Sequence, residues 1–214
     1  MPKPRSRPIR LKVWGRNACF TRPEMKVERV SYDVMTPSAA RGVLEAILWK
    51  PAIVWRITQI DVLKPIKWES VRRNEVGAVM SPRSGGIFVE DERQQRAGLI
   101  LRDVEYTIHA YCEMTDRAGP ADNVIKFEEM FKRRAENGQC FHRPYLGCRE
   151  FAAHFEPVLN DQPIREPIAE DLSLGWMLYD MDFGKESPMP RFFRASLENG
   201  TLKVPPYDDK EVRG

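Results

Sequence analysis

The sequence is poor in the residues that build metal centres and disulfide frameworks. Its 214 residues include only three histidines and four cysteines. No two cysteines form a C-x-x-C pair and no H-E-x-x-H motif is present, so we expect reduced structural thiols, no metal site and no cofactor. A Gly-rich phosphate loop and a G-x-S-x-G motif are also missing. These absences argue against nucleotide hydrolases and serine hydrolases.

Two further absences concern location and charge. The chain has no long apolar run, and its basic beginning, MPKPRSRPIRLK, lacks the apolar segment of a signal peptide. We therefore expect a cytoplasmic protein without membrane contact. The net charge is only +3, from 34 basic and 31 acidic residues. Because this imbalance is small, overall charge does not indicate nucleic acid binding, and only its distribution can do so.

Hydrophobic periodicity predicts an α+β chain. Alternating apolar residues mark strands, while Thr36 and Asn123 are N-cap candidates for two helices. The predicted strands cover 9–13, 53–63, 66–71, 104–114, 149–155, 176–183, 191–197 and 201–204. The first predicted helix lies within 36–51, with Thr36 as N-cap and Pro51 as the stop, and the second lies within 123–139, with Asn123 as N-cap and Asn-Gly at its end. Strands 53–63 and 66–71 are joined so closely that an antiparallel pair is the simplest arrangement. Residues 75–93, rich in Gly, Ser and Pro, are predicted to be irregular.

The order of these elements indicates two domains. Strand, helix, two strands, then strand, helix, strand is close to the split βαβ order of ferredoxin-like folds. We therefore predict a ferredoxin-like, RRM-like domain with an antiparallel sheet over residues 1–156. A small β-rich domain should occupy residues 157–214, beginning with the proline-containing linker 157–171. Within this second domain, Asn199-Gly200 predicts a hairpin turn.

Positive charge gathers in three clusters. The loop cluster, after the first strand, contains Arg22, Lys26 and Arg29. The strand cluster contains Arg72, Arg73 and Asn74. The helix cluster contains Lys132, Arg133 and Arg134. Basic groups interleaved with aromatic residues suit a site that follows an RNA backbone. Solvated loops, exposed strand ends and complementation of a helix dipole explain the same charges without RNA, so both interpretations stay open for each cluster.

Longer segments resemble a known family. They are FTRPEMKVERVSYDVMTPSAARGVLEAI, WKPAI, VLKPI, VRRNEV, RQQRA, KRRAENGQCF and LGCREF. In this order, between residues 11 and 155, they resemble the Cas5 family of type I-C CRISPR systems, within the RAMP superfamily. The resemblance implies a ferredoxin-like RNA-binding protein that cuts pre-crRNA without metal and keeps the 5′ handle of the crRNA. It also implies an antiviral effector complex, Cascade, with a backbone subunit, a large subunit and target DNA as partners.

The resemblance also implies where catalysis would occur. The family uses a tyrosine just before the Trp-Lys-Pro motif and an adjacent Lys-His pair in the second helix. These positions correspond here to Leu48, Lys126 and Phe127. Lys126 can still stabilise negative charge, but leucine and phenylalanine cannot transfer protons. Loss of a general acid or base typically costs roughly 10²–10⁴ in rate.

Three functions therefore remain. The first is a crRNA-binding Cascade subunit with doubtful catalytic competence. The second is an active metal-independent endoribonuclease with a relocated acid and base. His142, which follows the basic helix end, is the best substitute, ahead of Tyr111 and His109. The third is a general nucleic-acid-binding module outside CRISPR.

Overall fold

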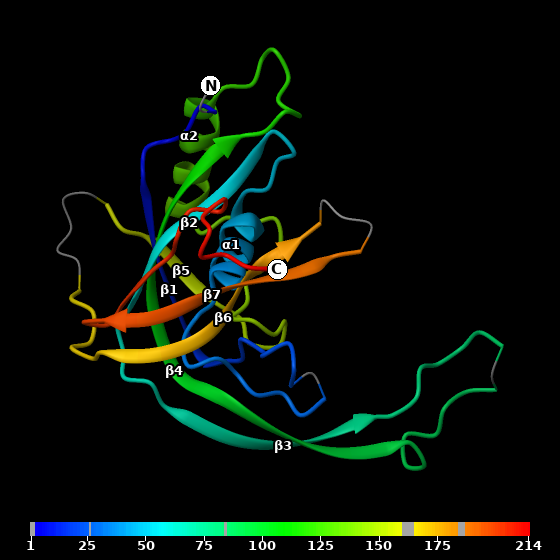
Figure 1. Cartoon of the computed structure of the whole chain (residues 1–214). Helices are drawn as coiled ribbons and strands as arrows, with labels where there is room; N and C mark the ends of the chain where they lie inside the picture. The colour runs from blue at the N-terminus through cyan, green and yellow to red at the C-terminus, as the bar shows by residue number, and fades with distance from the viewer. Residues whose placement is uncertain (1–2, 26, 84, 160–164, 184–186) are drawn as a thin grey trace.

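A computed structural model describes residues 3–25, 27–83, 85–159, 165–183 and 187–214. The described residues form an eight-stranded sheet in the order β5-β1-β4-β2-β8-β7-β6, with β3 paired to β4 outside this path (Figure 1). All strand pairs in it are antiparallel. The strands are β1 (Ile9–Ala18), β2 (Ile53–Val62), β3 (Trp68–Val76), β4 (Arg93–Met114), β5 (His154–Pro157), β6 (Leu172–Asp182), β7 (Met189–Glu198) and β8 (Thr201–Lys203). The α+β class is confirmed.

Two helices complete the described fold, and each begins where the sequence predicts. For α1 (Pro37–Ile47), the Thr36 side chain accepts a hydrogen bond from the Ala39 amide at 3.2 Å. For α2 (Val124–Glu136), the Asn123 side chain accepts from the Lys126 amide at 2.9 Å. The sequence predicts Pro51 as the stop of this helix, but α1 already ends at Ile47, because Leu48 is extended.

The predicted pairing of the segments 53–63 and 66–71 is also wrong. β3 pairs with the first part of β4, from Trp68 opposite Leu101 to Val76 opposite Arg93, whereas β2 pairs with β4 and β8. β4 is 22 residues long and starts well before the predicted residue 104. Its second part pairs with β1 and β2 in the body of the sheet.

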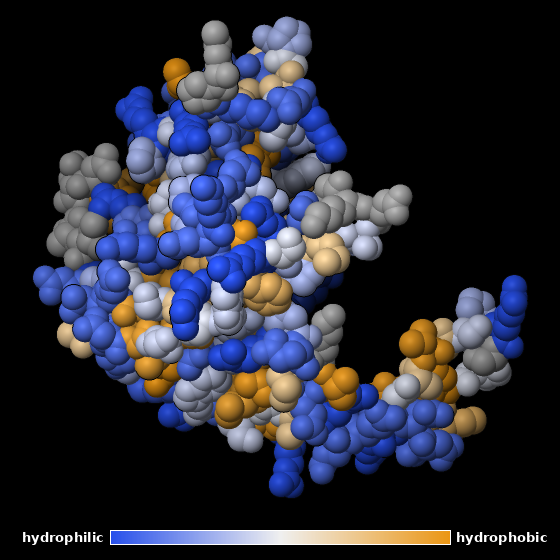
Figure 2. Space-filling model, in the orientation of Figure 1, coloured by the Kyte–Doolittle hydropathy of each residue, from blue (hydrophilic) through white to orange (hydrophobic). Residues whose placement is uncertain are grey.

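β3 and the first part of β4 form an arm that projects far from the body (Figure 1). In the space-filling view, a wide open concavity separates the arm from the body (Figure 2). The loop at the end of the arm exposes apolar side chains, including Val79 at 94% and Phe88 at 74%. Most of β3 is solvent-exposed or half-buried, so this hairpin gains little from the hydrophobic core.

The last three strands continue the same sheet. β8 pairs with β2, and β7 and β6 follow outward. The Asn199-Gly200 turn has positive φ at both residues and closes the β7–β8 hairpin, so the predicted hairpin is confirmed. Arg41 in α1 binds both carboxylate oxygens of Asp180 in β6, at 2.7 and 2.8 Å. The first helix is thus tied to the C-terminal strands, and the boundary at 156/157 stays a prediction.

The core lies between the helices and the inner sheet face. Leu11 and Val13 of β1, Ile108 of β4 and Leu44 of α1 are among its fully buried members. The strands β1, β2, β4 and β5, with α1 and α2 in the connections, have the order of a split βαβ unit. The finer ferredoxin-like assignment stays a prediction. No helix within the described ranges is long and apolar enough to cross a membrane.

Candidate nucleic-acid interface

Two of the three predicted basic clusters meet at one carboxylate. Glu150 forms ion pairs with Arg29 of the loop cluster, at 3.5 Å, and with Arg73 of the strand cluster. The Arg73 guanidinium also lies over the Phe151 ring, 5.4 Å from its centre. These contacts join residues that are more than 70 positions apart in the chain. The base of the arm is therefore a shared cationic and aromatic surface.

The loop that carries Glu150 is attached directly to β1 and the segment after it. The Cys19 amide donates to the Leu146 carbonyl at 3.1 Å, and Leu146 is fully buried. Gly147 has φ +81°, and a Cβ atom there would lie 2.0 Å from the Cys19 carbonyl oxygen. Because only glycine fits this approach, the conformation of the loop depends on residue 147.

Two cysteines lie at the same junction. The Thr21 hydroxyl is 3.5 Å from the Cys19 sulfur and 3.8 Å from the Cys148 sulfur. A hydrogen bond from the Cys19 thiol, together with Thr21 and the nearby Arg29 charge, lowers the pKa of Cys148 to about 6. The partnership with Cys148 and burial both raise the pKa of Cys19. Both cysteines are free thiols, and Cys148 is the one that favours the thiolate.

The third cluster divides between a structural and an exposed part. Arg134 donates to the Ile47 carbonyl at 2.8 Å and so completes the C-terminal end of α1. The Phe141 amide donates to the Ala46 carbonyl, also at 2.8 Å. Lys132 forms only a long, exposed ion pair of 3.9 Å with Glu136. The helix cluster therefore stabilises the junction of α1 and α2 while leaving Lys132 near solvent.

The remaining predicted RNA-binding residues differ in how free their side chains are. Arg72 and Arg133 are exposed and make no side-chain hydrogen bond or ion pair with the described part of the chain. Asn74 is exposed. Arg22 is held by Asp33 at 3.1 Å and lies over Tyr32, and Lys26 lies outside the described residues. Among the predicted RNA-binding residues, Arg72 and Arg133 are thus the cations most available to phosphate.

The two replaced catalytic positions are both in the core. Leu48 is 0% exposed and Phe127 is 2% exposed. The Leu48 carbonyl accepts a hydrogen bond from the Trp55 indole at 2.9 Å. Lys126 is half-exposed, pairs with Asp122 at 3.2 Å and lies 5.6 Å from the centre of the Phe127 ring. Of the three, only Lys126 offers a polar side chain to solvent.

The candidate substitutes have different surroundings. His142 is exposed and stacks on Tyr145, with ring centres 6.3 Å apart. The Nε2 atom of His109 lies 2.6 Å from Asp61. Burial alone would raise the pKa of Asp61, but hydrogen bonds from His109 and Gln59 outweigh it, so the pKa is lowered. Tyr111 is covered by the Arg5 guanidinium at 5.0 Å. His142 is the least constrained of the three.

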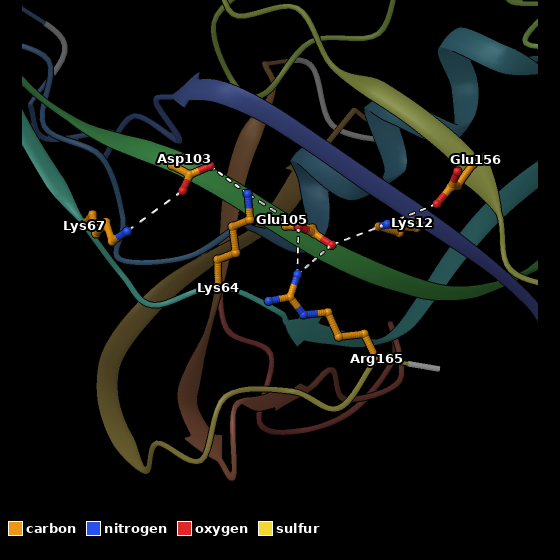
Figure 3. A network of polar contacts seen from close by, with 7 residues as sticks. All are labelled: Lys12, Lys64, Lys67, Asp103, Glu105, Glu156 and Arg165. Atoms are coloured by element: carbon orange, nitrogen blue, oxygen red, sulfur yellow. Dashed lines mark hydrogen bonds and ion pairs between the residues drawn. The ribbon is translucent and has the colours of Figure 1, made fainter. Parts of the chain in front are cut away.

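Several other cations are neutralised within the fold (Figure 3). Glu105, almost fully buried, lies 3.3–3.5 Å from Lys12, Lys64 and Arg165. The hydrogen bond that Lys64 donates to Asp103 raises the pKa of Lys64 and lowers the pKa of Asp103. This network connects β1, β4 and the segments beside them, so its lysines are less available to RNA than Arg72. No three His, Cys, Asp or Glu residues in the described ranges are grouped to hold a metal.

Comparison with known proteins identifies the family. A family model described as CRISPR-associated protein (Cas_Cas5), of the Cas5d type, matches residues 9–205. The chain belongs to the Cas5d family. A protein named CRISPR pre-crRNA endoribonuclease Cas5d from Mannheimia succiniciproducens is 53% identical over 223 residues, with 96% of this chain and 98% of the relative covered. One of the same name from Thermus thermophilus is 43% identical over 222 residues, covering 95% and 94%.

Solved structures share the fold of this Cas5d family member. A crystal structure of a CRISPR-associated protein superposes with a TM-score of 0.76 at 20% identity, covering 99% of both chains. A functionally uncharacterized Streptococcus mutans protein superposes with a TM-score of 0.74, also at 20% identity, covering 99% of this chain and 100% of the other. These two structures confirm the fold, while the family model and the two relatives confirm the resemblance in sequence to the Cas5 family.

Sequence reasoning missed the residues that assemble this Cas5d surface. Glu150, Phe151 and Gly147 all lie in the segment LGCREF, which identified the family. The prediction of a strand from residue 149 is wrong, because residues 148–151 form a turn in which the Phe151 amide donates to the Cys148 carbonyl, and β5 begins only at His154. The residues next to Glu150 in the sequence do not indicate that it pairs with arginines far away in the chain. The family motif itself was the signal that could have directed attention to these residues.

Proposed function

We propose that this chain binds the repeat-derived 5′ handle of crRNA as a subunit of a type I-C Cascade complex. Its partners are the backbone and large subunits and, through the complex, target DNA, and it works in the cytoplasm. The observation that carries the proposal is the meeting of Arg29 and Arg73 at Glu150, at the base of the projecting arm, in a Cas5d chain. Arg72, on the same strand as Arg73, is unpaired within the described chain.

The chemistry of this surface suits a phosphate backbone. Guanidinium groups bind phosphate through a rigid fork of donors. A carboxylate that holds two arginines fixes where their remaining donors point, so less side-chain entropy is lost when RNA binds. Phe151 and Tyr145 add rings near the same loop. The surface therefore combines fixed and free cations with aromatic groups, as sites for single-stranded RNA do.

The catalytic part of the proposal is that cleavage is slow. Metal-independent cleavage needs a base for the ribose 2′-hydroxyl and an acid for the leaving 5′ oxygen. The family positions for these groups hold Leu48 and Phe127, and both side chains are buried. Lys126 retains the ability to stabilise charge. Binding without efficient cutting is the function that these residues support best.

A second function is active cleavage through His142. This histidine is exposed, and its loop is attached to the same end of α1 that carries Leu48, through the hydrogen bond from Phe141 to Ala46. Two relatives that cover most of the chain are named pre-crRNA endoribonucleases. If this second function is correct, His142 transfers a proton during cleavage and Lys126 stabilises the negative charge of the phosphate.

Removing Arg72 and Arg133, the two cluster arginines without a side-chain partner among the described residues, should weaken handle binding. We expect Arg72→Ala with Arg133→Ala to reduce the slope of log K against log salt by about 1.4, because each phosphate contact to single-stranded RNA contributes roughly 0.7. The measurement is fluorescence anisotropy of labelled repeat RNA over a salt series. Lys3→Ala with Lys203→Ala removes the same charge from two side chains already paired with Asp116 and Glu198. Equal slopes for both double variants would contradict the proposal.

A further inference from the structure

The outer face of the β6–β7 hairpin contains a second hollow of mixed chemistry. It has a volume of about 510 Å³ and is lined by Ser173, Trp176, Arg194, Ser196, Glu211 and Arg213, among others. This volume falls in the range of ordinary ligand sites. The hollow shares no residue with the surface around Glu150, so a ligand here would be additional to the handle.

Trp176 is the one aromatic side chain among the described residues that line this hollow. Its side chain is 47% exposed although tryptophan usually packs in a core or an interface. Arg194 lies directly opposite it on β7. The Arg213 guanidinium lies over the indole, 5.4 Å from the ring centre. One flat ring is thus flanked by two cations from different segments.

The C-terminal segment is fixed in this place. Arg213 and Phe192 exchange two backbone hydrogen bonds, at 2.6 and 2.8 Å. Arg191 donates to the carbonyls of Tyr207 and Val212, at 2.9 and 3.3 Å. The anchored backbone keeps the Arg213 side chain within reach of Trp176. Arg194 and Arg213 form no ion pair with any described residue.

We propose that this face binds one unpaired nucleotide of a single-stranded nucleic acid, with its base stacked on Trp176 and its phosphates between Arg194 and Arg213. A base supplies the flat π-face on which tryptophan stacks. Phosphate supplies the negatively charged partner that the two guanidinium groups lack among the described residues. Ser173 and Ser196 add hydroxyl groups at the rim. Stacking of this kind does not depend on sequence.

A nucleic acid fits this face better than a protein segment does. The apolar side chains that a protein would use on this hairpin, Phe183 at 69% and Met189 at 41% exposure, do not line the hollow. Among the described residues, the hollow is lined by one aromatic ring, two guanidinium groups that form no ion pair, two hydroxyl groups, one carboxylate and Ala195. RNA and DNA share the features that the face recognises, so the experiment has one arm for each.

The test uses oligomers of 5-iodouridine and of 5-iododeoxyuridine, about 12 nucleotides long to span one single-strand site. Because they lack the repeat sequence, specific recognition of the handle does not contribute to their binding, and the position of the crosslink shows which surface holds them. After irradiation of the full-length protein, we expect the main crosslink in the peptide that contains Trp176. Trp176→Ala should abolish it and weaken binding by about 5- to 150-fold. Trp176→Phe should preserve most of both.

Matched variants separate the two sites. Arg194→Gln with Arg213→Gln should lower the slope of log K against log salt by about 1.4. Phe183→Ala, which removes an exposed aromatic side chain outside the hollow, should change neither this slope nor the crosslink. Arg72→Ala with Arg133→Ala should leave the Trp176 crosslink intact even if handle binding fails. A crosslink with RNA, with DNA or with both supports the site and identifies its ligand. The proposal would be overturned if the folded Trp176→Ala variant bound both oligomers as tightly as the parent. It would also be overturned if this variant lost the binding of a protein partner alone.

Discussion

Purified protein mixed with its cognate repeat RNA in EDTA is expected to cut at a rate about 10²–10⁴-fold below that of a family member with its acid and base in place. The physical reason is that the positions for these groups hold Leu48 and Phe127, buried at 0% and 2% exposure. Neither side chain can exchange a proton, and neither reaches solvent. The measurement is a time course of labelled repeat RNA with analysis of the product ends.

Histidine variants test the alternative outcome of this experiment. If the protein cuts quickly and leaves a 5′-hydroxyl and a cyclic phosphate, the expectation is wrong and His142→Ala becomes decisive. That variant should then lose cleavage while keeping RNA affinity. His154→Ala is the matched control, because His154 is exposed and stacks on Trp14 in another part of the sheet.

Gly147→Ala is expected to destabilise the protein by roughly 2 kcal/mol or more, which corresponds to a Tm lower by about 4–8 °C. The residue has φ +81°, and the added Cβ would lie 2.0 Å from the Cys19 carbonyl oxygen and 2.6 Å from its carbon. The loop must move away from Cys19, or the backbone that follows β1 must distort. Since Glu150 follows on this loop, RNA affinity should fall together with stability.

Gly42→Ala is the control for the glycine change. Gly42 lies in α1, and a Cβ atom there meets nothing within 4 Å. Helix propensity then predicts a stabilisation of about 0.5–1 kcal/mol. Thermal unfolding followed by circular dichroism measures both variants. Equal melting temperatures for Gly147→Ala and the parent would show that the close approach to Cys19 is not needed for the fold.

Local signals were enough to predict the caps and one turn. Thr36 and Asn123 have side chains that satisfy the first amides of a helix, and Asn199-Gly200 has the conformational freedom for a tight turn. The burial of Phe127 also follows from its spacing with Phe131 on the apolar face of α2. Each of these features depends on residues a few positions apart.

The arm and the meeting of the clusters could not be predicted in this way. The residues of β4 before Gly98 are exposed or half-buried on both faces, so no alternation of apolar and polar residues marked them as strand. The Arg73–Glu150 pair joins positions 77 apart, and composition gives no information about such a partner. Its formation depends on β3 folding back along β4 and on Gly147 fitting against Cys19.

The central claim is that the crRNA handle lies on the surface around Glu150, and hydrogen–deuterium exchange with and without handle RNA tests it most directly. The account predicts slower exchange in residues 68–76, which contain the strand cluster, and in 141–151, which contain Glu150 and Phe151. An RNA of the same length without the repeat sequence is the control and should protect these segments less. Protection confined to other segments, with 68–76 and 141–151 unchanged at saturating handle RNA, would contradict the account.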